Sequence, residues 1–248
     1  MRIRTAKIQT NKYKDYRFNL YLKQSELIKS CVDDCKSKRV VISSTGNKKL
    51  TDMFRVLITE QYEKEDDKYI CKYPKNILLI NSTGLLYFNP NDIEKCLLND
   101  ELFGIENIYK TTLYNKDKEL LTETELKKLN EMKKFDEIQS QFNIRHTHTS
   151  QLQINKKDFL MDLNEMIRNQ YSVDIFMYSP SIKTGISFNS TNEEHKTKDY
   201  YFNTHYSFGI CGSVCVREYI QMLFRVRELS ETTININLGG KYKQYVSP

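Results

Sequence analysis

With 248 residues, 39% of them hydrophobic and 28% charged, the chain can bury the core of one large domain or two small ones. It has no apolar run of the ~18 residues that would predict a membrane helix, and basic residues interrupt its first twenty positions, which argues against a secretory signal. The formal net charge of +6 is concentrated at the N-terminus, since residues 1–50 carry 13 Lys/Arg against 4 Asp/Glu and the remaining 198 carry 25 against 28. A basic arm before a near-neutral body fits a polyanionic partner such as nucleic acid, and an ordinary Lys-rich surface explains the charge equally well.

The cysteines indicate an intracellular protein with reduced thiols. Their density is too low for a disulfide-rich secreted domain, and the two CxxxC pairs lack the tighter CxxC spacing that a zinc site favours. His146 and His148 are better explained as a surface pair than as further zinc ligands. The six cysteines are Cys31, Cys35, Cys71, Cys96, Cys211 and Cys215.

Between residues 20 and 84, amphipathic helical stretches alternate with short apolar runs. Helical spacing of apolar residues predicts helices over residues 20–36 and about 48–63. The runs 39–44 and 76–81 are each followed by a turn that contains glycine, so they are expected to be buried strands. This alternation predicts an α/β fold with a parallel sheet covered by helices. The residues expected on the buried helix faces are Leu20, Leu22, Leu27, Ile28 and Val32, then Leu50, Phe54, Leu57 and Ile58.

Residues 88–150 interrupt this pattern. The segment is charged and rich in Asn and Lys, and its best helical stretch covers residues 122–142. Asp136-Glu137 does not follow an apolar strand, so it does not match the acidic motif of a nucleotide site. We expect a mostly helical, charged insertion in the core fold.

The α/β pattern resumes after residue 150. The expected strands are 173–178, 206–210 and 232–238, and the expected helices are 156–168 and 214–228. In an open α/β sheet, ligands gather at the carboxyl ends of the strands. The turn after residue 178 offers the hydroxyls of Thr184 and Ser187, with Gly185 allowing a phosphate close to the backbone. Taken alone, this pattern is more often a plain turn.

Helix 214–228 is expected to carry two stripes. A buried stripe would consist of Val216, Tyr219, Ile220 and Leu223. A polar stripe of Arg217, Gln221 and Arg225 follows i+4 spacing, and such guanidinium groups match the oxygens of a triphosphate held on a neighbouring surface. A solvated helix face paired with nearby glutamates would explain the same residues in isolation.

Two segments, in this order, resemble motifs V and VI of superfamily 2 helicases: DIFMYSPSIKTGISF at 174–188 and REYIQMLFRVREL at 217–229. The chain is more closely similar to the C-terminal lobe of herpesvirus-type replication origin-binding proteins and their relatives in large DNA viruses. Strand 39–44 and its helix resemble motif IV, and motif VI is the most specific part. The resemblance implies a RecA-like lobe over residues 38–248, with the insertion at about 88–150, after a basic N-terminal arm and lead-in helix at 1–37.

The resemblance implies catalytic roles on helix 214–228. Gln221 and Arg225 match the motif VI glutamine and first arginine, which face ATP bound on the other lobe. Arg225 would stabilise charge on the γ-phosphate as an arginine finger, with Arg227 as a second candidate. The chain departs from the family pattern at Phe224, where glycine is usual, and at Glu228, where many members carry another arginine.

The resemblance also implies contacts with DNA. Thr184, Gly185 and Ser187 match motif V, which couples the nucleotide cleft to the DNA strand. Ser43 and Ser44 lie where motif IV would contact a backbone phosphate.

The phosphate-binding motif of a complete motor is missing from the sequence. No GxxxxGK[ST] pattern occurs, and residues 44–49 lack its spacing and its final hydroxyl. No acidic DExx strand is evident either. ATP and Mg²⁺ are therefore expected to be bound mainly by an N-terminal helicase lobe, in cis or in trans, and this chain alone is not expected to hydrolyse ATP.

Two alternatives remain open. The chain could be a non-enzymatic accessory or DNA-binding lobe, or part of another superfamily 2 translocase such as that of a restriction system. Its Lys-, Asn- and Ile-rich composition is compatible with the AT-rich genome of a large DNA virus, which would place it in the host cytoplasm or nucleus.

Overall fold

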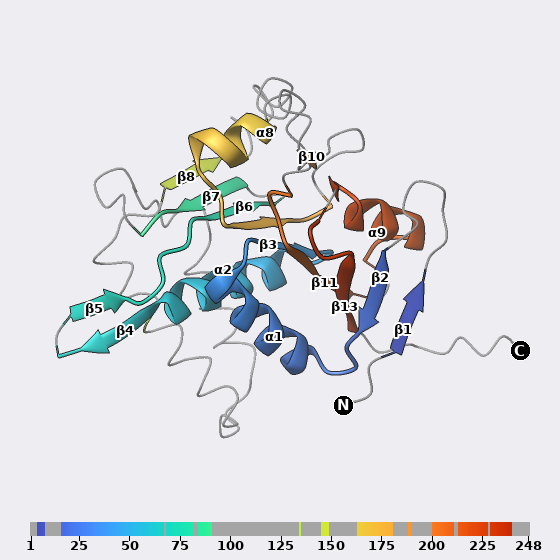
Figure 1. The fold of residues 1–248 in the computed structure, drawn as a ribbon, viewed down its shortest axis with the longest axis horizontal. Coiled ribbons are helices and arrows are strands. Elements are labelled where there is room, and N and C mark those ends of the chain that lie inside the picture. The colour runs from blue at the N-terminus through green and yellow to red at the C-terminus, as the bar shows by residue number, and fades with distance from the viewer. Residues whose placement is uncertain are drawn as a thin grey trace, which may run out of the picture.

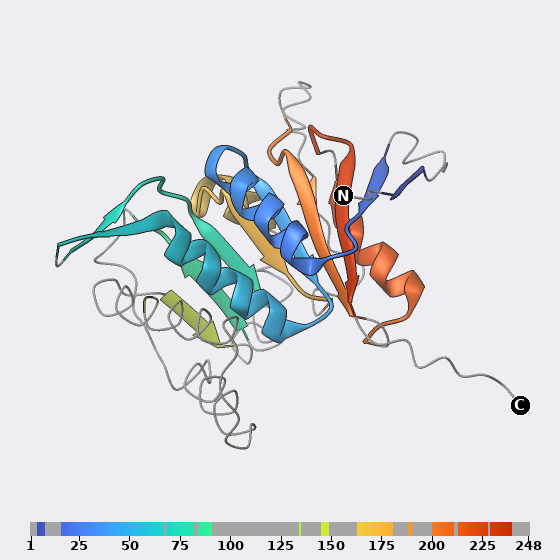
Figure 2. The same ribbon diagram turned by 90° about the horizontal axis from the view of Figure 1, so that it is seen from below.

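A nine-stranded sheet with helices on both faces forms the body of the protein (Figures 1 and 2). The computed structural model describes residues 4–7, 16–66, 68–81, 84–90, 134, 145–148, 163–180, 188–189, 200–210, 213–227 and 229–239. The strands of this sheet, in spatial order, are β1 (Arg4–Lys7), β2 (Arg17–Leu20), β13 (Thr233–Gly239), β11 (Thr204–Ile210), β3 (Val40–Ser44), β9 (Ile175–Tyr178), β6 (Ile77–Ile80), β7 (Gly84–Phe88) and β8 (Arg145–His148).

The six strands from β2 to β6 in this order run parallel, because every neighbouring pair among them is parallel. The edge strands are antiparallel: β1 pairs with β2 on one side, and β7 and β8 extend the sheet beyond β6 on the other. The expected α/β class, with a mainly parallel sheet flanked by helices, is therefore confirmed.

Each face of the sheet is covered by its own helices. Helices α1 (Gln24–Ser37) and α2 (Asn47–Gln61) cover one face, and α8 (Leu163–Glu165), the π-helical turn η1 (Met166–Gln170) and α9 (Val216–Leu223) cover the other (Figure 1). Alternation along β3 sends Val40 and Ile42 toward α1 and α2, and Val41 toward the opposite core. The central strands are apolar on both faces, as expected for a parallel sheet that helices cover on each side.

The first helix begins later than its apolar spacing predicts. α1 starts at Gln24, Leu20 belongs to strand β2, and Leu22 is 63% exposed, so neither leucine lies on its buried face. The predicted boundary between residues 37 and 38 stays a prediction, although strand β2 from the first segment pairs with β13 in the main sheet.

One end of the predicted insertion belongs to the sheet. Residues 145–148 form β8, which pairs with β7, so this part of the expected helical segment is a strand. Lys134 is helical, and the rest of the helix expected at 122–142 lies outside the described residues.

Two smaller pairings complete the fold. α2 leads directly into a hairpin of β4 (Tyr62–Glu65) and β5 (Lys68–Cys71), which the apolar pattern did not predict. A short parallel pair joins β10 (Phe188–Asn189) to β12 (Val226–Arg227). Within the described residues, no helix is long and apolar enough to cross a membrane.

Candidate functional site

The carboxyl ends of β3 and β11 meet at a point where the chain changes faces. β3 leads to α2 on one face, and its neighbour β11 leads to α9 on the other face. Such a switch point separates the connecting loops and is where open α/β sheets bind ligands. It is therefore the first place to look for a site.

At this point the two strand ends are tied together. The Ile210 backbone N–H donates to Thr45 Oγ1 at 2.9 Å, and the Thr45 N–H donates to the Phe208 carbonyl at 3.1 Å. A Cβ on Gly46 would lie 2.6 Å from Ile210 Cδ1, so glycine permits this close approach. Only Thr45 and Gly46 separate β3 from α2, which is too short a connection for a phosphate-cradling loop.

A buried polar network lies beneath α9. Ser43 Oγ is 2.9 Å from His205 Nε2 and donates to Ser207 Oγ at 2.9 Å. The Tyr219 hydroxyl of α9 donates to the same Ser207 oxygen at 2.9 Å. Burial lowers the pKa of His205 to about 3 and raises that of Tyr219 to about 12. At neutral pH both groups are uncharged, which suits a network that fixes the helix on the sheet.

Tyr178, at the end of β9, extends this network to the last turn of α9. Its hydroxyl donates to the Met222 carbonyl at 2.7 Å, and its ring centroid lies 6.1 Å from that of His205. Burial raises the pKa of Tyr178, while the charge of nearby Arg225 lowers it. The phenol is thus protonated and holds the helix end beside Arg225.

Helix α9 differs from its expected form in two respects. It ends at Leu223, so Arg225 follows the helix and does not continue the Arg217–Gln221 stripe. The expected buried stripe is right for Leu223 and for the half-buried Tyr219, but it is wrong for Val216 and Ile220, which are 76% and 39% exposed, and it omits the buried Met222. The helix ends where Phe224 packs edge-on against Tyr16 and Phe18, with ring centroids 5.5 and 6.2 Å apart.

The predicted catalytic residues lie on and just after α9. Gln221 is exposed on the helix, Arg225 is partly buried, and Arg227 lies on β12 opposite Asn189 of β10. Burial lowers the pKa of Arg225 and neighbouring Tyr178 raises it, but an arginine keeps its charge in proteins.

Segment 174–188, which was expected to act as motif V, ends beside segment 217–229, which was expected to act as motif VI. Phe188 pairs with Val226, and the Phe188 N–H donates to the Arg225 carbonyl at 2.8 Å. Thr184, Gly185 and Ser187 lie outside the described residues, in the connection that ends at this pairing.

The predicted phosphate contacts of β3 are not at the surface. Ser43 and Ser44 are both 0% exposed, and Ser43 is held by His205 and Ser207. A direct contact of Ser43 with a DNA phosphate would require this network to open.

Sequence reasoning did not single out His205, Ser207 or Tyr178, and it placed Tyr219 only in a buried apolar stripe. A signal for the first two exists, because polar residues at alternate positions of an apolar strand share one face. Which face that is, and that Ser43 lies opposite them, depends on the strand order.

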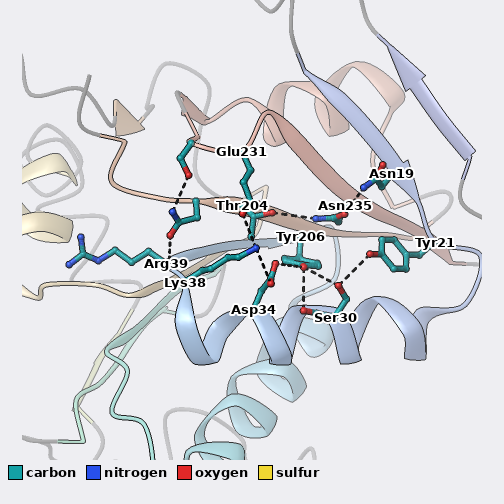
Figure 3. A network of polar contacts seen from close by, with 12 residues as sticks. Asn19, Tyr21, Ser30, Asp34, Lys38, Arg39, Thr204, Tyr206, Glu231 and Asn235 are labelled. Atoms are coloured by element: carbon teal, nitrogen blue, oxygen red, sulfur yellow. Dashed lines mark hydrogen bonds and ion pairs between the residues drawn. The ribbon is translucent and has the colours of Figure 1, made fainter. Parts of the chain in front are cut away.

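A second polar network anchors α1 on the opposite face (Figure 3). The Tyr206 hydroxyl donates to Asp34 Oδ2 at 2.7 Å and lies 3.1 Å from Ser30 Oγ. Lys38 contacts Asp34 at 3.1 Å and Glu231 at 2.7 Å, which joins the helix end to the segment before β13. Tyr206 lies in the core on the α1 face of the sheet, opposite the face that α9 covers, so we assign this network to holding α1 on the sheet.

The described residues contain no group of three or more His, Cys, Asp or Glu side chains that could hold a metal ion. The four described cysteines, Cys31, Cys35, Cys71 and Cys215, are free thiols.

Compared with protein-family models, curated proteins and solved structures, the chain matches none of them.

Proposed function

We propose that the chain is the C-terminal, RecA-like motor lobe of an ATP-dependent DNA helicase of the replication origin-binding kind. In this role it supplies motifs IV, V and VI, including an arginine finger and contacts to the DNA backbone. The observation that carries the proposal is the pairing of β10 with β12, which brings together the ends of the two segments similar to motifs V and VI.

The arrangement around Arg225 supports this role. The guanidinium follows a helix that hydrogen bonds fix to the sheet through Tyr219 and Tyr178. A charge on a rigid support can reach a phosphate on a facing lobe with little reorganisation, and that is the requirement for transition-state stabilisation. Gln221, exposed on the same helix, adds an amide that suits hydrogen bonding to the nucleotide.

The fit to ATP and Mg²⁺ is partial. Arg225 and Gln221 suit phosphate oxygens, whereas the two-residue connection between β3 and α2 cannot enclose a triphosphate. The nucleotide and its metal would therefore be held by an N-terminal lobe, joined in cis or in trans, and would supply the γ-phosphate on which Arg225 acts.

The first test is translation of the genomic DNA upstream of Met1 in frame. A P-loop and a DExx strand are expected there or in a separately encoded lobe. A start codon directly after a stop codon, together with no such lobe in the genome, contradicts the proposal and directs attention to nucleotide-free DNA binding.

The biochemical test measures ATP hydrolysis with and without DNA. The chain alone is expected to show none above background, while the chain joined to its N-terminal lobe hydrolyses ATP. In the joined protein, Arg225→Ala should lower kcat by about 10³-fold, as loss of an arginine finger does. Arg17→Ala, which removes an exposed arginine at the start of β2, is the matched control and should leave kcat unchanged. Robust turnover by the chain alone that Arg225→Ala abolishes is incompatible with half a motor.

A further inference from the structure

A third core cluster lies between α9, β2 and β13. In it Leu223 of α9 packs with Phe18 of β2 and with Ile234 and Ile236 of β13. Strand alternation places Leu238 on the same face as Ile236, and a Cβ on Gly209 would lie 2.7 Å from Leu238 Cδ2 and 3.1 Å from Tyr219 Cζ. Leu238 and Tyr219 therefore lie next to each other above Gly209, so apolar side chains extend from this cluster toward the surface.

Apolar side chains also continue along α9 beyond this cluster. At about 100° per residue, Val216 and Ile220 lie on the same flank of α9 as Leu223, which faces β13. Arg217 and Gln221 point away from the sheet, and Met222 lies on the opposite flank beside Tyr178. Figure 1 shows α9 next to β13 and β2.

Four exposed residues form what we call the α9–β13 apolar surface: Val216 and Ile220 on α9, Leu238 on β13, and Leu22 after β2. Leu22 is placed beside the end of β13 because the carbonyl of the preceding Tyr21 accepts a hydrogen bond from the Asn237 amide at 2.8 Å. The exposed fractions of Val216, Ile220, Leu238 and Leu22 are 76%, 39%, 46% and 63%, and these residues make up four of the seven large hydrophobic residues exposed in the described part of the chain. Single exposed apolar residues are ordinary, but a group that continues a core cluster marks an interaction surface.

Basic residues border this surface. Lys23 follows Leu22, Arg217 follows Val216, and both are exposed. The nearest carboxylate on α9, Glu218, lies on the other flank and accepts the Cys215 backbone N–H at 3.2 Å.

We propose that the α9–β13 apolar surface binds an acidic peptide segment that carries large apolar side chains, supplied by another protein. The basic border selects the acidic residues, and the exposed Val216 and Ile220 bury the apolar ones. A DNA backbone would use the border but would leave the apolar side chains uncovered. This binding is separate from the motor-lobe role and does not depend on it.

The test uses the whole chain and fluorescence anisotropy of a labelled twelve-residue peptide in which Leu and Phe alternate with Glu and Asp. Two control peptides replace the acids with Gln or the apolar residues with Ser, and neither should bind. Val216→Ser and Ile220→Ser should each weaken binding roughly fivefold to tenfold, by removing apolar area that becomes buried. Arg217→Glu should weaken it several-fold, and added salt should reduce the difference between wild type and this variant.

Ile70→Ser is the matched control, because Ile70 is 46% exposed on the distant strand β5. It should leave the affinity unchanged, and an unchanged urea midpoint for every variant confirms intact folding. The proposal is overturned if the acidic peptide does not bind, if the Gln peptide binds equally well, or if Ile70→Ser weakens binding as much as Ile220→Ser. It is also overturned if a DNA duplex displaces the peptide and its own binding falls with Val216→Ser.

Discussion

Replacing His205 tests the buried network beneath α9 through the pH dependence of stability. His205 is fully buried, and burial lowers its pKa in the folded protein to about 3. In the unfolded chain a histidine titrates at about 6.5. As the pH falls below 6.5, His205 therefore becomes protonated in the unfolded state but stays neutral in the folded state. The stability from the neutral imidazole is fully present above pH 6.5 and is lost as the pH falls from there toward 3.

The size of this loss follows from linkage. Between pH 7 and pH 5, one such histidine lowers the free energy of unfolding by about 2 kcal/mol. The result does not depend on the depth of the shift, because any folded-state pKa below about 4 gives the same value at pH 5.

The assay is urea unfolding followed by circular dichroism at pH 7 and pH 5, for wild type and His205→Gln. Glutamine has no titrating group, and its amide can occupy the position of Nε2 beside Ser43. The other histidines, three of the four in the chain, are present in both proteins, so their contributions cancel in the difference. Wild type should lose about 2 kcal/mol more than the variant between the two pH values.

Equal losses, within about 0.5 kcal/mol, would refute the reasoning, because the imidazole would then be charged or hydrated in the folded protein. An NMR titration of wild type gives the same answer without a variant: one histidine should remain neutral down to about pH 4.

Two further substitutions test the packing on either face of the sheet. Tyr206→Phe removes the hydroxyl that donates to Asp34 and should lower the free energy of unfolding, measured with urea, by about 1–2 kcal/mol. The control Tyr200→Phe, at a residue that is 38% exposed, should change it little. Equal effects of the two substitutions would contradict this expectation. Gly209→Ala places a Cβ 2.7 Å from Leu238 Cδ2 and should cost about 1–3 kcal/mol. Adding Leu238→Ala should recover part of that loss, and no recovery would mean that the strain arises elsewhere.

Much of the parallel sheet could be predicted from the sequence. The apolar runs that form β3, β6 and β9 are buried on both faces, so their composition alone distinguishes them from loops, whereas β11 carries polar residues at alternate positions. α2 was also predictable, because its apolar residues recur at helical spacing and face a single core.

Other elements depend on partners that are distant in the sequence. β2 is four residues long and includes Arg17 and Asn19, and only its pairing with β13 makes it a strand. β8 lies in a charged segment and is a strand because β7 offers it an edge. Local composition carries little information about either pairing.

The site was predictable in position more than in detail. Helical spacing alone could not show that Met222 would be buried and that Val216 and Ile220 would be exposed, because this depends on where the sheet lies. The end of α9 could not be predicted from the local sequence either, because it ends where Phe224 packs against Tyr16 and Phe18 near the start of the chain. Whether Ser43 faces solvent or protein was likewise decided by α9, which only the three-dimensional arrangement places above it.

The parallel pairing of β2 with β13 determines when the protein can finish folding. Asn19 and Asn235, which share a hydrogen bond across this pair, are 216 positions apart. At a synthesis rate of ~5–20 residues per second, β2 is synthesised about 10–40 s before its partner strand. During that interval the β2 edge and Phe18 lack the partners that β13 and α9 later provide, so we expect a chaperone or the ribosome surface to shield them. Ribosome profiling of chaperone-bound nascent chains should therefore find this segment occupied until residues 233–239 emerge.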